Sequence, residues 1–325
     1  MELHGHGPTI DDLRALRLHG PGDLRVDDVP GPEPQVGDVV VEVEVALTGH
    51  EEQRRLAGGA DALDGSPAPF GRELAGIDTR SGLRVIAAAS APCGHCPPCL
   101  AEREELCRRP ALLEGALAER VVVPARIAEV NFHPVPRGLD PAVGALADSL
   151  ACCLHAVERA NVKPSSLVAV LGAGPIGLML CACVTDAGGY VAAVGGRSSR
   201  HALAATFGAR PADPTDADVV IEAAGTAQAR RDALDLVQPG GTVVFVGTAE
   251  PAEPIAADAE RIQREELTLR GAAGHAPRHF RAALAFLASG AYPWERLITH
   301  VVPLERVAAL LAEPPADFLK AAVRP

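Results

Sequence analysis

The sequence predicts an α/β protein with two domains, one a compact β domain and the other built on a doubly wound, mostly parallel sheet. With 325 residues the chain exceeds the usual size of a single domain. From Leu18 onward, short β-branched runs alternate with Pro, Gly and Asp turns, which is typical of a compact β domain. Beyond Pro141, strand-like and helical segments alternate, and this order favours parallel strands with right-handed connections.

The composition narrows the class of protein. Hydrophobic residues make up 48% of the chain and aromatic residues only 3%, so the cores should be aliphatic and a surface for stacking bases is not expected. The formal net charge is −12 and no segment concentrates Lys and Arg, which disfavours a nucleic-acid partner. No run approaches the roughly 18 apolar residues of a membrane span, and the N-terminus does not resemble an export signal. We therefore expect a cytoplasmic protein that acts on a small molecule, with no membrane partner.

Four of the eight cysteines lie close together in the β domain. They follow the spacing CxxCxxC and then seven residues to the fourth, as Cys93, Cys96, Cys99 and Cys107. Without an export signal, such a cluster is better explained by a metal than by disulfides. Four thiolates can surround one zinc ion at about 2.3 Å and leave no position for water or substrate. We predict one structural Zn²⁺ per chain in a lobe of residues 91–110, with His95 facing solvent and not acting as a fifth ligand.

A glycine-rich turn in the second domain predicts a dinucleotide site. The stretch "LVAVLGAGPIGLM" contains GxGxxG after an apolar strand and at the start of a helix, which is the context that the motif requires. Its first glycine permits a tight turn, the second lets the pyrophosphate approach the backbone, and the third lets helix pack on strand. The predicted contacts are Gly172, Gly174, Pro175, Ile176 and Gly177.

The end of the next strand indicates which cofactor binds. Sites for NAD usually carry Asp or Glu about 20 residues after the turn, to bind the ribose 2′-hydroxyl. Here the sequence reads "AVGGRSSRH", with no carboxylate. A guanidinium and hydroxyl groups suit a 2′-phosphate, so we predict NADP(H), with Arg197 as the main contact and Ser198 and Arg200 as further contacts. The alternative is that these arginines are solvated surface residues.

The chain resembles the zinc-type medium-chain dehydrogenase/reductases, the family of alcohol, polyol and threonine dehydrogenases. The resemblance extends over nearly everything after about Ala15. It rests on the four-cysteine lobe and on "GAGPIGL", "DVVIEAAGT", "PGGTVVFVG" and "LITHVVPLE". It implies a GroES-like β domain of residues 1–143 and 296–325, a Rossmann domain of residues 144–295, and a homodimer or homotetramer.

The resemblance also locates the catalytic zinc of the relatives that oxidise alcohols, which is generally held by a Cys, a His and a third Cys, Glu or Asp. In this chain Thr48 aligns with the Cys, Arg72 with the His, and Asp148 with the third ligand. A neutral hydroxyl is a poor zinc ligand and a guanidinium repels the cation. We therefore expect the catalytic zinc to be absent and Arg72 to take over part of its charge role, paired with Asp148 or Glu73. Thr48, which can donate or accept a hydrogen bond, is a candidate catalytic residue together with these three.

His50 aligns with the Ser or Thr that begins the proton relay of the family. Its imidazole could donate a proton to a developing oxyanion, because its unperturbed pKa lies near neutrality. Two alternatives stay open: a histidine that is merely hydrogen-bonded in the cleft wall, and a rebuilt metal site made of His50, Glu73 and Asp148.

Further cofactor contacts follow from the resemblance. They are Ala224 and Gly225 at the end of the fourth strand, near the adenosine side of the cleft, Val246, Gly247 and Thr248 beside the nicotinamide, and Lys320 at the phosphates. The leading hypothesis is an NADPH-dependent reductase that transfers hydride to an activated alkene, iminium or carbonyl without a catalytic metal. A second hypothesis is an NADP-dependent dehydrogenase of a polyol or amino alcohol, and a third is an inactive NADP(H)-binding sensor or partner protein.

Overall fold

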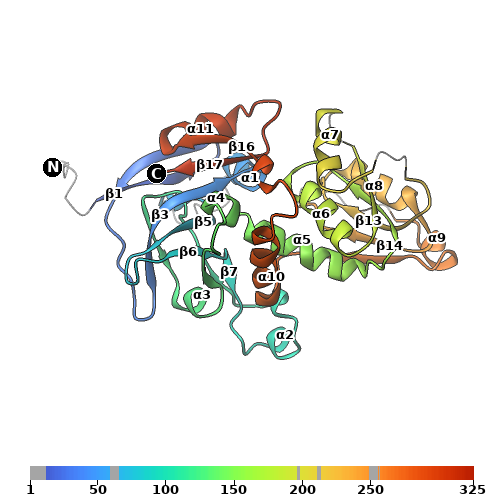
Figure 1. Cartoon of the computed structure of the whole chain (residues 1–325), viewed down its shortest axis with the longest axis horizontal. Coiled ribbons are helices and arrows are strands. Elements are labelled where there is room, and N and C mark those ends of the chain that lie inside the picture. Colours follow the sequence, from blue (N-terminus) through green and yellow to red (C-terminus); the bar gives the residue numbers. More distant parts are fainter. Residues whose placement is uncertain (1–11, 59–65, 196–197, 211–213, 249–254, 256) are drawn as a thin grey trace. The chain divides into compact units, whose positions relative to one another are not determined.

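The computed structural model describes residues 12–58, 66–195, 198–210, 214–248, 255 and 257–325 (Figure 1). The chain divides into two compact units. Unit 1 runs to Asp148 and also contains Leu284–Ser289 and Trp294–Pro325, whereas unit 2 contains Ser149–Ala283 and Gly290–Pro293. The first part of unit 1 ends at Asp148, five residues beyond the boundary at residue 143 that the resemblance implied. The reason is that helix α4 (Pro141–Gly144) packs on strands of unit 1.

Unit 1 is built on antiparallel strands, with one parallel pair formed by its last two strands. One sheet has the order β2-β1-β4, and a second has the order β10-β6-β5-β3-β17-β16 with β9 also paired to β3; β7 and β8 form a short ribbon. The strands are β1 (Leu13–Gly20), β2 (Asp23–Val29), β3 (Val39–Thr48), β4 (Ala68–Pro69), β5 (Glu73–Asp78), β6 (Arg84–Ala87), β7 (Ser90–Ala91), β8 (Ala111–Leu112), β9 (Arg120–Val123), β10 (Phe132–Pro134), β16 (Ile298–Pro303) and β17 (Lys320–Arg324).

Short helices connect these strands. They are α1 (His50–Gly58), α2 (Pro97–Leu100), α3 (Ala125–Val130), α11 (Leu304–Ala312) and the 3₁₀ turns η1 (Glu104–Leu106) and η2 (Trp294–Leu297). Two longer helices, α5 (Ala147–Ala160) and α10 (Pro277–Ala288), contribute residues to both units. The helices in the described part of the chain are too short or too polar to cross a membrane.

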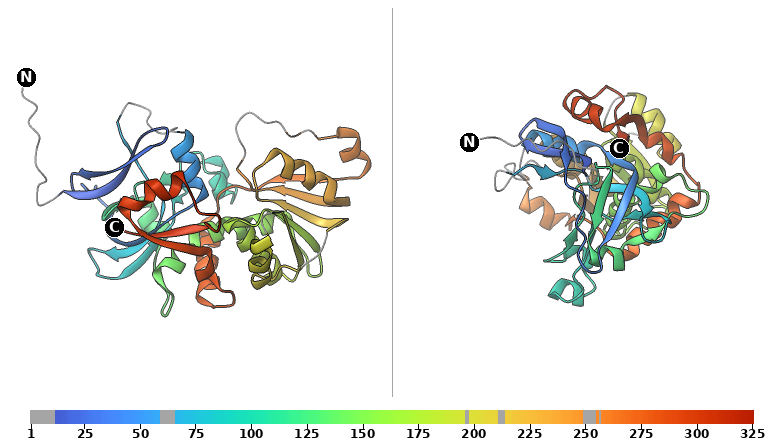
Figure 2. Two further views of the ribbon diagram at one scale, coloured as in Figure 1. Left: turned by 90° about the horizontal axis from the view of Figure 1, so that it is seen from above. Right: turned by 90° about the vertical axis from the view of Figure 1, so that its left-hand side faces the viewer.

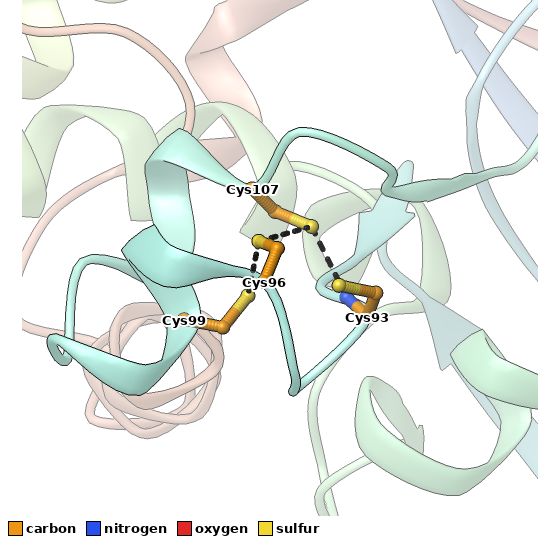
Figure 3. A group of neighbouring side chains, drawn as sticks. All are labelled: Cys93, Cys96, Cys99 and Cys107. Atoms are coloured by element: carbon orange, nitrogen blue, oxygen red, sulfur yellow. Dashed lines mark hydrogen bonds between the residues drawn. The ribbon is translucent and has the colours of Figure 1, made fainter.

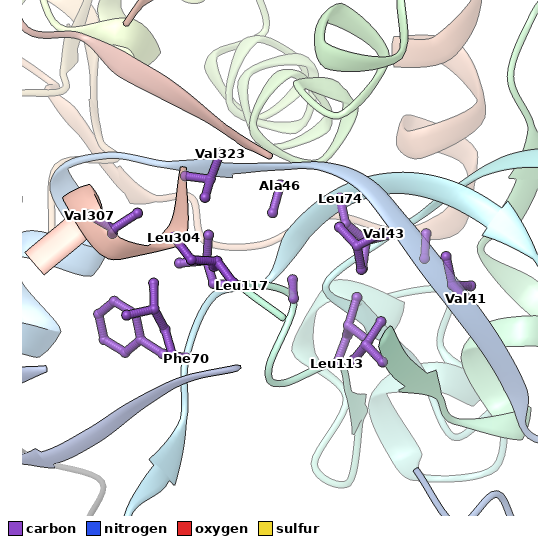
Figure 4. Packing of buried hydrophobic residues seen from close by; sticks show 14 of the residues in the cluster. Val41, Val43, Ala46, Phe70, Leu74, Leu113, Leu117, Leu304, Val307 and Val323 are labelled. Carbon is purple, nitrogen blue, oxygen red and sulfur yellow. The ribbon is translucent and has the colours of Figure 1, made fainter. Parts of the chain in front are cut away.

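The C-terminal segment completes unit 1. Strand β17 pairs antiparallel with β3, with Ala321 opposite Thr48, so the red end of the chain lies among blue strands in Figures 1 and 2. Side chains of β3, β5, β17 and α11 fill one aliphatic core beside Phe70 (Figure 4). Each fully buried Val or Leu in such a core contributes roughly 1.5–3 kcal/mol. This packing brings residues from both ends of the sequence to the end of β3.

Unit 2 is a parallel sheet of order β12-β11-β13-β14-β15. Its strands are β11 (Leu167–Leu171), β12 (Tyr190–Val194), β13 (Ala217–Glu222), β14 (Val237–Phe245) and β15 (Thr268–Gly271), and its further helices are α6 (Pro175–Asp186), α7 (Ser198–Thr206), α8 (Ala227–Leu236) and α9 (Ala259–Arg264). Arg210 forms a single parallel bridge with Ala192 of β12. The bridge stands where the third strand belongs in the order 3-2-1-4-5-6 of dinucleotide-binding sheets. The predicted α/β fold class is confirmed.

Candidate functional site

The four cysteines of unit 1 converge on one point (Figure 3). Their sulfur atoms all lie within 4.8 Å of one another, with Cys96 Sγ 3.4 Å from Cys99 Sγ and 3.8 Å from Cys107 Sγ. The N–H groups of Cys93 and Arg109 donate to Cys107 Sγ over 3.2 and 3.4 Å. Four converging sulfurs with N–H donors directed at them are a donor set that suits a structural zinc ion.

His95 lies within this lobe, but both of its ring nitrogens form hydrogen bonds and neither is directed at the sulfur atoms. Nδ1 lies 2.8 Å from the carbonyl oxygen of Cys93, and Nε2 lies 3.0 Å from Nη2 of Arg109. Because the guanidinium can only donate, Nε2 accepts and Nδ1 carries the hydrogen of a neutral ring. The side chain is exposed, so the metal site consists of four sulfurs.

The glycine-rich turn joins β11 to α6 in unit 2. Gly172 has a φ of +111°, which L side chains rarely adopt. A Cβ at Gly177 would lie 1.8 Å from the carbonyl oxygen of Gly172, so only glycine lets the helix approach the strand this closely. Gly174 is the N-cap of α6 and Pro175 its first residue, where the missing N–H costs no helical hydrogen bond. The turn therefore has the geometry that a dinucleotide pyrophosphate requires.

The predicted contacts of the 2′-phosphate follow β12. Arg197 and the side chain of Ser198 lie outside the described residues, and Arg200 is a half-buried residue of α7. The assignment of NADP(H) to these three residues therefore stays a prediction.

The other predicted contacts of unit 2 meet at the carboxyl ends of β13 and β14. Val246 and Gly247 donate their N–H groups to the main-chain oxygen of Glu222, and Ala224 and Gly225 donate theirs to its carboxylate. No pattern in the sequence singles out Glu222, because an acidic residue that ends a strand has no distinguishing spacing. Thr248 continues from Gly247, and its carbonyl oxygen would lie 2.4 Å from a Cβ at Gly225.

In unit 1, Arg72 lies in a network of alternating charges. Its Nε and Nη2 lie 2.9 and 2.7 Å from Glu114 Oε1, and its Nη1 lies 3.3 Å from Glu51 Oε1. Glu114 also accepts from Arg55 over 3.2 Å, and the Arg55 guanidinium lies over the ring of Phe70. The positive charge of Arg72 is thus balanced by two carboxylates. Glu114, which lies 42 residues away in the sequence, was missed by sequence reasoning.

A second charged cluster lies beside the end of β3. Lys320 Nζ is 2.5 Å from Glu73 Oε2, and both side chains are largely buried. Glu52 is also buried and accepts from the N–H of Gly49 over 2.9 Å. Burial raises the pKa of Glu52 to about 7. The resemblance assigned Lys320 to the cofactor phosphates, whereas its ammonium group bonds to Glu73 within unit 1.

The remaining predicted catalytic residues are Thr48, His50 and Asp148. Thr48 ends β3 and is fully buried, and its Oγ1 has no hydrogen-bond partner among the described residues. His50 is the exposed first residue of α1. Asp148 Oδ1 accepts from the N–H of Ala89 over 2.8 Å.

These residues do not fit a catalytic zinc ion. At the three ligand positions stand a hydroxyl, a guanidinium in ion pairs with two carboxylates, and an aspartate that accepts from the main chain. In the part of the chain that the structure describes, the four cysteines are the one group of three or more His, Cys, Asp or Glu side chains able to hold an ion. His50, Glu73 and Asp148 do not form such a group, which disfavours the alternative of a metal site rebuilt from them.

Comparison with known proteins establishes the family. Residues 145–324 match the family described as glucose dehydrogenase C-terminus, and residues 35–136 match the alcohol dehydrogenase GroES-like domain. The chain is a zinc-type medium-chain dehydrogenase/reductase. Its β domain is GroES-like and its parallel sheet is of the Rossmann type, as predicted.

Relatives of this medium-chain dehydrogenase/reductase include enzymes of sugar and polyol metabolism. The L-galactonate-5-dehydrogenase of Escherichia coli K12 is 29% identical over 280 residues, which cover 77% of this chain and 80% of the relative. The sorbitol dehydrogenase of Bombyx mori is 28% identical over 327 residues, which cover 90% and 92%. A solved structure from Sinorhizobium meliloti 1021, named as a zinc-binding dehydrogenase bound to NADP, has a TM-score of 0.87 and 30% identity, covering 97% of this chain and 99% of that one. Like these relatives, the protein is an oxidoreductase.

Proposed function

We propose that this protein is an NADP(H)-dependent dehydrogenase that oxidises a hydroxyl group of a polyol or sugar acid without a catalytic zinc ion. The names of L-galactonate-5-dehydrogenase and sorbitol dehydrogenase support a polyhydroxylated substrate. They favour the second hypothesis from the sequence over reduction of an activated double bond. The NADP in the Sinorhizobium meliloti structure, together with the strand end "AVGGRSSRH" that lacks a carboxylate, supports NADP(H) over NAD(H).

The observation that carries the metal-free part of the proposal is the position of Arg72. The resemblance aligns Arg72 with a zinc-binding histidine of relatives, and two carboxylates hold its guanidinium in place. An Arg fixed by charged hydrogen bonds keeps its orientation and can direct further N–H groups at a developing alkoxide. This electrostatic stabilisation replaces part of what a Lewis acid supplies.

Oxidation of a hydroxyl also requires a proton acceptor. NADP⁺, when bound, accepts the hydride from carbon, and the hydroxyl proton must leave to the protein or to solvent. His50 supports this role because it is exposed at the first position of α1, two residues after Thr48. Its imidazole can take the proton at a ring nitrogen and release it to water.

Turnover of a panel of polyols and sugar acids tests the proposal. The purified protein is assayed with NADP⁺ and NAD⁺ in turn, and its zinc content is measured. We expect turnover of at least one substrate, a preference for NADP⁺, and one zinc per chain. A preference for NAD⁺, or reduction of enones and imines with no polyol turnover, would contradict the proposal. NADPH binding with no turnover of any substrate would instead favour a sensor or partner protein.

Two variants test the role assigned to Arg72. Arg72→Ala should lower kcat by about 100-fold, the size of one lost charged donor to an oxyanion. Arg84→Ala is the matched control, because Arg84 forms a similar pair with Glu44 over 2.7 Å but is 61% exposed. Equal activities of the two variants would remove Arg72 from the catalytic machinery.

A further inference from the structure

Glu222 joins the turns at the ends of two neighbouring strands in unit 2. It is the last residue of β13 and is completely buried. Its Oε1 accepts from the N–H groups of Ala224 and Gly225 over 2.7 and 2.6 Å. Its main-chain oxygen accepts from the N–H groups of Val246 and Gly247, which follow β14, over 2.8 and 2.9 Å. One residue thus bonds to four N–H groups in two turns.

The two turns are in direct contact and leave room only for glycine. A Cβ at Gly247 would lie 2.3 Å from the nitrogen of Gly225 and 2.8 Å from Glu222 Oε2. Gly225 has a φ of +73°, and a Cβ there would lie 2.4 Å from the carbonyl oxygen of Thr248. A small shift of either turn therefore moves the other. The Glu222 carboxylate bonds to the first turn, and its main-chain oxygen bonds to the second.

The turn at Ala224–Gly225 also lies against the glycine-rich motif. A Cβ at Gly172 would lie 3.0 Å from the nitrogen of Ala224, one of the two groups that donate to the Glu222 carboxylate. The ends of β11, β13 and β14 are therefore packed together around main-chain atoms. In open α/β sheets a dinucleotide binds at these carboxyl ends, where the strand order reverses.

Burial of the Glu222 carboxylate at this position is unfavourable for stability. Glu222 Oε2 is buried and has no hydrogen-bond partner among the described residues. Burying a charged group with an unsatisfied oxygen costs stability, and an apolar side chain of similar volume would avoid that cost. The compensating interaction is the pair of short N–H bonds to Oε1, which sets the conformation of the turn that starts at Ala224.

The sheet order indicates which half of the cofactor these turns face. The adenosine ribose lies at the end of the strand that follows the glycine-rich turn, here β12. Strands β13 and β14 lie on the other side of β11, so their ends belong to the opposite half. This order assigns Ala224 and Gly225 to the nicotinamide half and not to the adenosine side that the resemblance implied. We propose that Glu222 is a positioning residue that holds the turns at Ala224–Gly225 and Val246–Gly247 in the conformation that receives the nicotinamide half of NADP(H). This inference rests on the proposed cofactor.

Binding measurements on the full chain test the inference. Glu222→Gln keeps the size of the side chain and one acceptor oxygen but removes the charge. We expect this variant to bind NADPH about tenfold more weakly, the effect of weakening one charged hydrogen bond. Its affinity for adenosine 2′,5′-bisphosphate, which carries only the adenosine half, should match that of the wild type. Hydrogen exchange at the Ala224 and Gly225 amides should become faster.

Glu260→Gln is the matched control, because Glu260 lies on α9 of the same unit with its side chain 82% exposed. It should change neither affinity. Unchanged NADPH binding by Glu222→Gln would overturn the inference, and so would an equal loss for NADPH and for adenosine 2′,5′-bisphosphate, which would indicate general loosening of unit 2. If the wild type does not bind NADPH, the proposed cofactor is wrong, and the inference about Glu222 is then wrong as well.

Discussion

Lys320 and Glu73 form a salt bridge inside unit 1, with Nζ 2.5 Å from Oε2 and side chains that are 10% and 13% exposed. They lie on β17 and β5, the two strands that flank β3. Burial alone would lower the pKa of Lys320, but the carboxylates of Glu73 and Glu52 outweigh it and hold the pKa above its usual value. The ammonium group therefore stays charged, and its main partner is another residue of the β domain.

Removing the lysine should destabilise the protein. Lys320→Met leaves the Glu73 carboxylate buried without its cation, which costs about 3–5 kcal/mol in comparable buried pairs. Urea titration followed by circular dichroism measures the loss. The double variant Glu73→Gln/Lys320→Met removes both charges and should recover much of the stability. An unchanged unfolding midpoint for Lys320→Met would show that the pair contributes nothing.

The double variant also tests the cofactor contact that the resemblance assigns to Lys320. It removes the ammonium group without leaving a buried charge, so a change in NADPH affinity cannot be attributed to a damaged β domain. Weaker binding by this variant supports the contact with the phosphates. Equal binding confines Lys320 to the salt bridge.

Glu52 should make stability depend on pH. Burial raises its pKa from 4.5 to about 7, so the folded state holds a proton that the unfolded chain has already released. The stabilising contribution of this proton is fully present below pH 4.5 and is lost as the pH rises through about 7. Integrated between pH 5 and pH 8, the loss is roughly 2–3 kcal/mol.

Glu52→Gln isolates this effect. The amide oxygen can still accept from the N–H of Gly49, but the side chain no longer titrates. Urea titrations of both proteins at pH 5, 6, 7 and 8 should show the wild type losing stability relative to the variant across this range. Parallel curves would mean that Glu52 titrates near its ordinary pKa.

The parts of the site that the sequence predicted are those encoded by local spacing. Four cysteines within one loop and three glycines in one turn have partners only a few residues away, so their geometry follows from the motif. The partners of Arg72 and Lys320 could not be read in this way, because Glu114 lies 42 residues from the first and Glu73 lies 247 residues from the second. Glu73 meets Lys320 because β5 and β17 both pair with β3. Glu114 meets Arg72 because main-chain hydrogen bonds join Ala116 and Leu117 to Gly71 and Phe70.

We expect the four-cysteine lobe to hold one zinc ion per chain. Cys99→Ser removes one buried sulfur and should reduce the zinc content to well below one per chain. The loss should lower the thermal midpoint, because the ion stabilises only the folded lobe. Elemental analysis and thermal scans give both readouts. Retention of a full equivalent of zinc by Cys99→Ser would place the ion elsewhere.

Introducing two ligands should create the catalytic metal site that we propose to be absent. Thr48→Cys/Arg72→His places a thiolate and an imidazole at the positions that zinc-binding relatives use, while Asp148 is already present. The reason for changing both residues is electrostatic: with Arg72 in place, its positive charge would repel a divalent ion even when a thiolate stands at position 48. Thr48→Cys alone is therefore the matched control and should keep one zinc per chain, whereas the double variant should bind two. Cobalt substitution gives a second readout, because a Co²⁺ ion that is bound tetrahedrally by thiolates absorbs visible light. A second zinc in Thr48→Cys alone would show that the charge of Arg72 is not what keeps a divalent ion out.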